Sequence, residues 1–175
     1  EILVDSLRQI GASIEYIDKE GYPPLLIRPS KFTRNKLQID TSKSSQYISS
    51  LLLIAPRIPG GLEIELIGRE TSTSYIDMTV SLLNKIGVKI ILKKNYFKVF
   101  EHQNINPIKV SIESDWSSAS YFYSIVAMAN IGYSLTLSSF NISSLQGDSN
   151  IVEIYKIFGV KTIYKGEKLK LEKVK

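Results

Sequence analysis

The segment Asp40-Thr-Ser-Lys-Ser-Ser-Gln-Tyr-Ile-Ser-Ser-Leu-Leu-Leu-Ile-Ala-Pro56 begins as a hydroxyl-rich turn and continues as an apolar run. Residues 44–55 predict a helix that is apolar on most sides, so we expect it to be largely buried. Pro56 should end this helix, because the residue before a proline disfavours helical dihedral angles. A variant returns as Asp115-Trp-Ser-Ser-Ala-Ser-Tyr-Phe-Tyr-Ser-Ile-Val-Ala-Met-Ala129 and predicts a second buried helix over 117–129. The chain is therefore predicted to be built from repeats.

The surroundings of both segments follow the same order of strand, helix, strand, helix and hairpin. A glycine ends three of the predicted helices in similar contexts, and glycine there supplies the left-handed helix cap. We therefore predict an α/β (α+β) fold of repeated β-α-β-α-β-β units, about two and a half of them, because repeats decide the architecture. The predicted parts are residues 1–34 as the tail of one repeat, 35–107 as a complete repeat and 108–175 as the next. The predicted elements are helix 1–10, strands 12–17 and 24–28; strand 36–40, helix 44–55, strand 62–67, helix 74–86, strands 88–92 and 96–100; strand 108–112, helix 117–129, strand 133–137, helix 150–158, strands 160–164 and 168–171.

The composition is that of an ordinary globular protein. The 175 residues are 43% apolar and 22% charged, and they include no cysteine. This excludes a disulfide framework, a thiolate metal site and a cysteine nucleophile, and it fits the cytoplasm that we expect. The longest apolar run, Leu51 to Ala55, is too short to span a bilayer, so no membrane partner is expected. The chain begins at Glu1, inside a predicted helix, and we expect it to be a fragment of a longer protein.

The net charge of +5 is mild, and the basic residues are spread along the chain. A solvated surface accounts for such a distribution. A phosphorylated or carboxylated substrate is the more specific interpretation. Nucleic acid is a weaker candidate, because no basic stripe with interleaved aromatic residues is present.

Two predicted helix starts are rich in hydroxyl groups. Ser44, Ser45 and Gln46 open the first helix, where unpaired backbone N–H groups and the positive end of the helix dipole favour an anion. Ser72 and Tyr75 flank the start of the next helix, so both starts could converge on one phosphate. Simple helix capping is the more common explanation for such serines, and Tyr75 could be a core aromatic residue. Neither segment has the glycine pattern of a P-loop.

Other notable residues have structural explanations. Asp115 is predicted to be the N-cap of its helix, Trp116 a packing residue, and Gln146-Gly-Asp148 a turn. His102 is the only histidine, which excludes a site with paired histidine ligands for a metal. We expect it to be a solvated surface residue. No pair of carboxylates stands out for acid–base chemistry.

Three motifs together resemble one enzyme family. They are Ser44-Ser-Gln46, Ser72-x-x-Tyr-Ile-Asp-Met-Thr79 and Asp115-x-Ser-Ser-Ala-Ser-Tyr-Phe122, and the similarity runs through the whole chain. The family is 5-enolpyruvylshikimate-3-phosphate synthase, the 3-phosphoshikimate 1-carboxyvinyltransferase of aromatic amino acid biosynthesis. The resemblance implies two globular domains of three units each, with substrates bound between them. Residues 1–107 would then be the later part of the N-terminal domain, and residues 108–175 one repeat of the C-terminal domain.

The resemblance also implies a function for named residues. The family's shikimate-3-phosphate contacts carry over to Ser44, Ser45, Gln46 and Ser72, and a substrate-side tyrosine corresponds to Tyr75. The whole enzyme would move the carboxyvinyl group of phosphoenolpyruvate to the 5-hydroxyl of shikimate-3-phosphate, as a monomer and with neither a metal nor an organic cofactor.

This chain departs from the family in two ways. It has Thr73-Ser74 where the family often has Lys-Pro, so one positive charge near the phosphate is missing. The family's phosphoenolpyruvate clamp and its catalytic acids have no counterpart in these residues. We therefore expect the chain to be inactive alone.

Two alternatives stay open. One is a fragment of the sister enolpyruvyl transferase that acts on UDP-N-acetylglucosamine. The other is a non-catalytic basic α/β module that binds RNA, although no aromatic platform for bases is visible.

Overall fold

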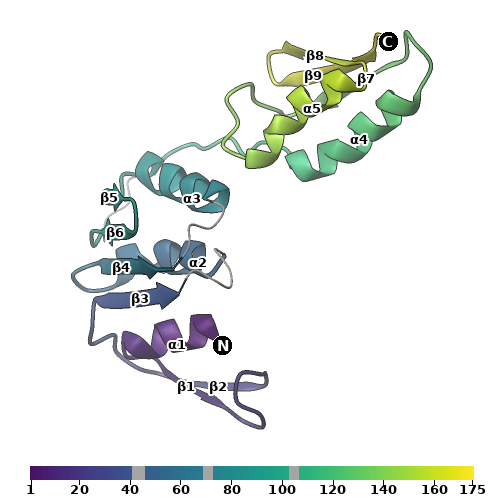
Figure 1. The fold of residues 1–175 in the computed structure, drawn as a ribbon. Coiled ribbons are helices and arrows are strands. Elements are labelled where there is room, and N and C mark those ends of the chain that lie inside the picture. The colour runs from purple at the N-terminus through teal and green to yellow at the C-terminus, as the bar shows by residue number, and fades with distance from the viewer. Residues whose placement is uncertain (41–45, 69–72, 103–106) are drawn as a thin grey trace. The chain divides into compact units, whose positions relative to one another are not determined.

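The computed structural model describes residues 1–40, 46–68, 73–102 and 107–175. The chain divides into two compact units, Glu1–Ile108 and Lys109–Lys175 (Figure 1). Each unit has its own apolar core.

The first unit begins with helix α1 (Ile2–Gln9) and an antiparallel pair of strands, β1 (Ser13–Tyr16) and β2 (Leu25–Arg28). Gly11 ends the helix with a φ of +110°, as its position after the periodic residues predicted. A Cβ atom there would lie 2.9 Å from Thr33 Oγ1 and 3.0 Å from the Lys31 carbonyl oxygen. Glycine therefore allows the end of α1 to lie against the segment that leads into the next strand.

A four-stranded sheet forms the centre of the first unit, with the strand order β3-β4-β6-β5. Strands β3 and β4 are parallel, from Lys36 opposite Glu63 to Asp40 opposite Ile67, and the remaining pairs are antiparallel. A parallel pair requires a crossover connection, which α2 supplies. The elements are β3 (Lys36–Asp40), α2 (Gln46–Ile54), η1 (Ala55–Arg57), β4 (Leu62–Ile67), α3 (Ser74–Lys85), β5 (Ile90–Lys93) and β6 (Tyr96–Val99).

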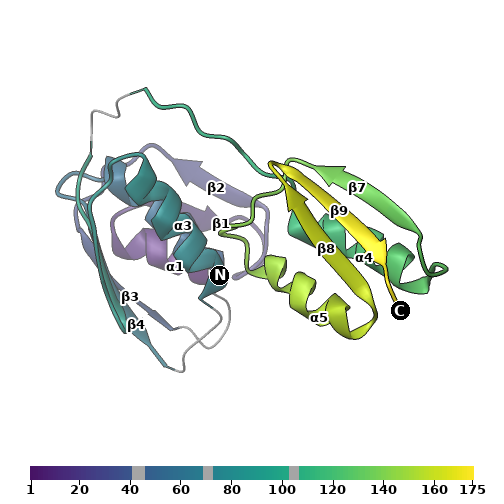
Figure 2. The same ribbon diagram turned by 90° about the horizontal axis from the view of Figure 1, so that it is seen from above.

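The core of the first unit lies between one face of this sheet and the helices. Alternate strand residues point inward, because side chains alternate between the two faces of a strand. The view from above shows α1 and α3 on the same side of the sheet (Figure 2). The core includes Leu37, Ile39, Leu62, Ile64, Phe97 and Val99 from the sheet, Ile48, Leu51 and Leu52 from α2, and Ile76, Val80 and Leu83 from α3.

Helix α2 ends at Ile54, just before Pro56, as predicted. Pro56 lies near the start of the short 3-10 helix η1, where a proline has no N–H to leave unsatisfied. Two other expectations for these helices were wrong. The apolar side chain of Leu53 is 59% exposed, so α2 is buried on one face only. In α3 the sequence predicted an apolar stripe of Tyr75, Met78, Leu82, Leu83 and Ile86. Of these only Leu83 is buried, and the rest of the buried face is formed by Ile76, Thr79 and Val80.

The outer face of the sheet carries an ion-pair cluster centred on Glu63. Its carboxylate lies 3.2 Å from Lys36 Nζ and 3.0 Å from Lys98 Nζ. Hydrogen bonding to Lys98, followed by hydrogen bonding to Lys36, lowers the pKa of Glu63. A carboxyl group with a lowered pKa stabilises the fold above its unfolded pKa, and this contribution is lost as the pH falls through the lowered value.

We therefore expect Glu63→Gln to destabilise the first unit at pH 7, and the difference from the parent chain to shrink as the pH falls below the ordinary carboxyl value of 4.5. Urea unfolding at pH 7 and in acid measures this. Glu65→Gln is the control, because Glu65 accepts a 2.9 Å hydrogen bond from the neutral amide of Gln38. A Glu63→Gln effect that is the same at both pH values would contradict the assignment.

The second unit is a three-stranded antiparallel sheet with the order β7-β9-β8, packed against two helices. Its core centres on Trp116 and Tyr123, whose side chains are fully buried. The prediction of Trp116 as a packing residue is confirmed. The elements are α4 (Trp116–Met128), β7 (Ser134–Ser138), η2 (Gly147–Asn150), α5 (Ile151–Ile157), β8 (Val160–Lys165) and β9 (Lys168–Lys173).

The strand predicted at 108–112 does not form, and Ile112 is 79% exposed. The connection to β7 comes later, where Ser114 N donates to the Ser139 carbonyl at 2.6 Å and Ser114 Oγ to the Ser138 carbonyl at 3.0 Å. Alternating hydropathy reports only a tendency to form a strand. A strand also needs a neighbouring strand along its length, and residues 108–112 do not run alongside one.

Helix α4 is also less buried than predicted, because Tyr121 is 73% exposed and Met128 is 81% exposed. One sheet covers one face of a helix, and only a further layer could cover the opposite face.

Candidate substrate-binding site

The topology of the first unit brings two helix starts to the same end of the sheet. Strands β3 and β4 are parallel neighbours and end at Asp40 and Ile67, which lie opposite each other. Each is followed by a helix, and α2 and α3 pack against each other. Because the carboxyl ends of parallel strands meet at one edge, both connections start at this edge, where α/β folds commonly bind ligands.

Gln46 is the first residue of α2, and its side chain is exposed. Its carbonyl accepts a hydrogen bond of 3.2 Å from Ser50 Oγ, one turn further along. The side-chain amide carries both donors and an acceptor, so it can bind a hydroxyl or an anionic oxygen at the start of the helix.

Tyr75 is the second residue of α3, and its side chain is 51% exposed. The interpretation of Tyr75 as a core aromatic residue is therefore wrong. The Tyr75 carbonyl accepts a 2.8 Å hydrogen bond from the buried Thr79 hydroxyl, which fixes the backbone of the first turn. Thr73 is the N-cap, and its side chain makes no capping hydrogen bond.

The other three predicted site residues are Ser44, Ser45 and Ser72, and they lie outside the described residues. Of the five predicted contacts, the structure therefore places Gln46 and Tyr75. These two stand at the starts of two helices that pack together.

The corresponding helix start in the second unit is filled by the chain's own acceptors. Asp115 is the N-cap, as predicted, and its carboxylate accepts hydrogen bonds of 3.1 Å from the backbone N–H groups of both Ser117 and Ser118. The backbone N–H of Trp116 donates to Gln146 Oε1 at 2.9 Å. Asp148 accepts a short hydrogen bond from the Ser117 hydroxyl.

The electrostatics agree with this structural role. The hydrogen bond from the Ser118 hydroxyl, together with the backbone N–H groups of Ser117 and Ser118, lowers the pKa of Asp115, so the carboxyl group is ionised at neutral pH. A negative group at the helix start repels a second anion. The α4 start is therefore a structural cap. Sequence reasoning missed the contributions of Gln146 and Asp148, whose only signal was the motif Gln146-Gly-Asp148 preceding the next helix.

The remaining candidates do not form a catalytic cluster. His102 is partly buried, which differs from the expected solvated residue, and its backbone N–H donates to the Pro56 carbonyl at 2.8 Å. Within the described part of the chain, no group of three or more acidic or histidine side chains could hold a metal ion. No described helix is both long enough and apolar enough to cross a membrane.

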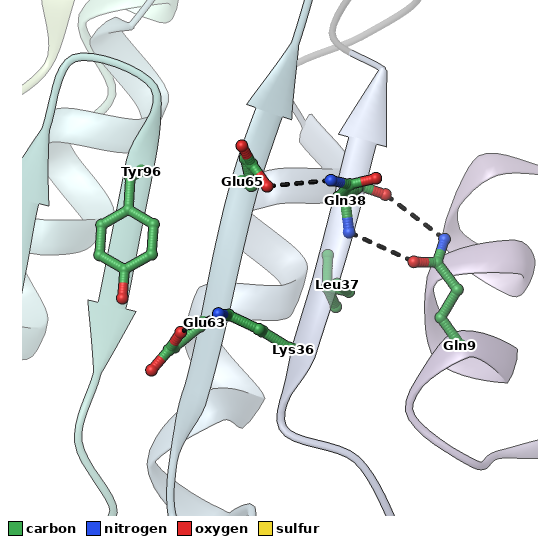
Figure 3. A pocket seen from close by; sticks show the side chains of 7 residues that line it. All are labelled: Gln9, Lys36, Leu37, Gln38, Glu63, Glu65 and Tyr96. Atoms are coloured by element: carbon green, nitrogen blue, oxygen red, sulfur yellow. Dashed lines mark hydrogen bonds and ion pairs between the residues drawn. The ribbon is translucent and has the colours of Figure 1, made fainter.

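A pocket opens on the polar face of the four-stranded sheet, with Gln9 of α1 at one side (Figure 3). Gln9, Lys36, Gln38, Glu63 and Tyr96 are among its lining residues. Lys36 forms an ion pair with Glu63 in this pocket, and the neutral amide of Gln38 donates a hydrogen bond to Glu65. The pocket is thus separate from the helix starts that carry Gln46 and Tyr75.

The comparison with solved structures establishes the class of fold. The chain is similar to EPSP synthase from Acinetobacter baumannii with a TM-score of 0.68 at 20% sequence identity, over 99% of this chain and 39% of that one. The α/β fold of repeated units is therefore confirmed as the enolpyruvyl transferase fold.

Sequence comparisons establish the family. The family model of EPSP synthase (3-phosphoshikimate 1-carboxyvinyltransferase) matches residues 1–174, so the chain belongs to this family. The 3-phosphoshikimate 1-carboxyvinyltransferase of Actinobacillus pleuropneumoniae serotype 5b is 39% identical over 99% of this chain, and that of Bacteroides fragilis is 36% identical over 99%. The chain spans 40% and 42% of the length of these two relatives.

Proposed function

We propose that the chain is part of a 3-phosphoshikimate 1-carboxyvinyltransferase, an enzyme of aromatic amino acid biosynthesis. The whole protein transfers the carboxyvinyl group of phosphoenolpyruvate to the 5-hydroxyl of shikimate-3-phosphate and releases phosphate. The match of the family model to residues 1–174 carries this proposal. The whole enzyme is proposed to act as a cytoplasmic monomer, without nucleic acid or membrane partners.

In this proposal the chain supplies one side of the shikimate-3-phosphate site. The starts of α2 and α3 face the substrate, with Ser44, Ser45 and Ser72 on the phosphate and Gln46 on the shikimate ring. The half-exposed Tyr75 adds a phenolic donor beside them. Backbone N–H groups at a helix start bind phosphate well, which offsets part of the missing positive charge at Thr73-Ser74.

The two units take different roles in this proposal. The first presents helix starts to the substrate, whereas the α4 start of the second is closed by Asp115 and Gln146. Residues 1–107 are assigned to the later part of an N-terminal domain, and residues 108–175 to one repeat of a C-terminal domain. The exposed apolar face of α4 supports this assignment, because a further layer of a larger domain would bury it.

We expect Gln46→Ala to weaken binding of shikimate-3-phosphate to the 175-residue chain about fivefold, the value of one neutral hydrogen bond. Isothermal titration calorimetry measures the affinity. Tyr75→Phe should give a loss of similar size, because it removes the hydroxyl alone. Asn84→Ala is the matched control, since Asn84 is exposed at the opposite end of α3.

Two further measurements on the same chain, an assay of phosphate release and a titration with UDP-N-acetylglucosamine, test the wider assignment. The chain should release no phosphate from shikimate-3-phosphate and phosphoenolpyruvate, because the family's phosphoenolpyruvate clamp is not among its residues. Binding of UDP-N-acetylglucosamine in place of shikimate-3-phosphate would contradict the proposal. Equal affinities of the parent chain and both site variants would contradict the assigned residues.

A further inference from the structure

The first turn of α3 is restrained from its carbonyl side. Thr79 Oγ1 donates to the Tyr75 carbonyl at 2.8 Å, one turn back along the helix. The N-cap residue Thr73 makes no capping hydrogen bond with its side chain. A capping side chain would accept from the backbone N–H groups of this turn. The Thr79 hydroxyl therefore restrains the helix start without occupying the N–H groups that an anion binds.

Packing alone does not account for a hydroxyl group at position 79. Thr79 is 7% exposed and lies on the buried face of α3 with Ile76, Val80 and Leu83. Valine has the same branched shape and a similar helix propensity, and it would bury a methyl group in place of the hydroxyl. The feature that valine could not reproduce is the hydrogen bond to the Tyr75 carbonyl.

This hydrogen bond acts on the backbone from which the Tyr75 side chain extends. Residues four apart are neighbours on a helix surface, so Thr79 lies one turn below Tyr75 at the border of the buried face. An α-helix gives the Tyr75 carbonyl one backbone donor, and the hydroxyl adds a second. Helix ends fray, and Tyr75 is only the second residue of α3. A second donor therefore holds the backbone of Tyr75 in its helical position.

Hydroxyl-to-carbonyl bonds also occur at the starts of two other helices, and the differences are informative. In α2 the exposed Ser50 donates to the Gln46 carbonyl at 3.2 Å, where water can replace the hydroxyl. In α4 Ser120 donates to the Ser117 carbonyl at 2.6 Å, but the Asp115 carboxylate also takes up N–H groups of that turn. At the α3 start the hydroxyl is buried, and the N-cap side chain leaves the N–H groups alone.

We propose that Thr79 is a positioning residue for substrate binding, whose buried hydroxyl holds the first turn of α3 so that Tyr75 is in place before the substrate arrives. This role rests on the proposed function, in which Tyr75 faces shikimate-3-phosphate. A side chain that is restrained before binding loses less conformational entropy on binding. Thr79 acts through Tyr75 and makes no contact with the substrate.

Two substitutions of Thr79 separate positioning from stability. Thr79→Val removes the hydroxyl and keeps the branched shape, so the urea midpoint of the first unit should stay the same or rise. Its affinity for shikimate-3-phosphate in isothermal titration calorimetry should fall about fivefold, as for one neutral hydrogen bond. Thr79→Ser keeps the hydroxyl and loses a buried methyl group, so the midpoint should fall while the affinity stays within about twofold of the parent chain. Ser81→Ala, a hydroxyl deletion further along α3, is the control and should change neither.

A purely structural Thr79 would give affinities that follow the midpoints, and that result would overturn the proposal. A double-mutant cycle tests whether Thr79 acts through Tyr75. In a Tyr75→Ala background the positioned side chain is gone, so Thr79→Val should weaken binding no further than about twofold. A full additional fivefold loss in that background would show that Thr79 acts by another route.

Hydrogen exchange without substrate separates the role of Thr79 from the proposed function. The Asp77 amide donates to the Thr73 carbonyl at 2.8 Å and reports on opening of the first turn. Thr79→Val should speed its exchange about fivefold, and Thr79→Ser should not. The Gly87 amide, at the far end of α3, is the internal reference and should keep its rate.

The two readouts fail in different ways. A parent chain that does not bind shikimate-3-phosphate would refute the proposed function, while exchange at Asp77 still decides whether the Thr79 hydroxyl holds the turn. A parent chain that binds with the same affinity as Thr79→Val would overturn the role of Thr79 alone. Equal exchange at Asp77 in the parent chain and Thr79→Val would overturn it as well.

Discussion

Gly61→Ala should destabilise the first unit by about 4 kcal/mol or more, in the range that marks a specific structural conflict. Gly61 has a φ of +78°, and a side chain in this left-handed region costs about 1–2 kcal/mol. A Cβ atom there would also lie 2.1 Å from the Val99 carbonyl oxygen and 2.9 Å from the Glu101 backbone nitrogen. Both obstacles belong to the backbone beside β6, so the pairing of β4 with β6 would have to open.

The adjacent glycine provides a matched control. Gly60 has a φ of +77°, but a Cβ atom there would meet only the Asn35 side-chain amide, at 3.2 Å. Gly60→Ala should therefore cost only the backbone strain, about 1–2 kcal/mol. Urea unfolding followed by circular dichroism measures both changes. Trp116, the only tryptophan, reports by fluorescence on the second unit, which should be unaffected. Equal effects of the two substitutions would show that contact with the β6 backbone is not the cause.

Trp116→Ala should destabilise the second unit by about 3–5 kcal/mol, the usual cost of truncating a buried tryptophan. The side chain is fully buried and packs edge-to-face on Phe140, with ring centroids 5.0 Å apart. Its indole N–H also donates to Glu113 at 3.4 Å. A small unit has little stability in reserve, so we expect most of its protected amides to exchange rapidly.

Hydrogen exchange with mass spectrometry resolves the effect by segment. Amides of Lys109–Lys175 should lose protection, whereas those of Glu1–Ile108 should keep it, because the two units have separate cores. Tyr121→Ala is the control on the same helix, since its side chain is 73% exposed and should change stability by no more than about 0.5 kcal/mol. Loss of protection throughout both units would mean that they unfold cooperatively.

Local sequence patterns predicted most of the elements but not their surroundings. The three helices that end at Gly11, Gly87 and Gly159 do so as predicted, because a positive φ is a local requirement that glycine meets. The strand expected at 108–112 failed, because pairing depends on the path of a distant β7. The buried face of α3 differed from the predicted stripe. A hydropathy pattern treats Tyr75 and Ile76 alike, and only the packing of α3 decides that Ile76 is the buried one.

The candidate site shows the same division. The motifs identified Gln46 and Tyr75 as residues at helix starts, and the structure places both there, exposed. At the start of α4 the motif predicted the N-cap Asp115. It did not predict the second acceptor, Gln146, which reaches the Trp116 backbone N–H from 30 residues further along.

The sequence by itself determined the repeat, the order of most helices and strands, the family motifs and the glycine-ended helices, because each depends on residues close together in the chain. The tertiary structure alone decided which helix face is buried, whether residues 108–112 pair and how the α4 start is filled. These features depend on groups far apart in the chain, such as Trp116 and Gln146, which are 30 residues apart. Hydrogen bonds at such separations are set by the placement of whole elements, which no local pattern encodes.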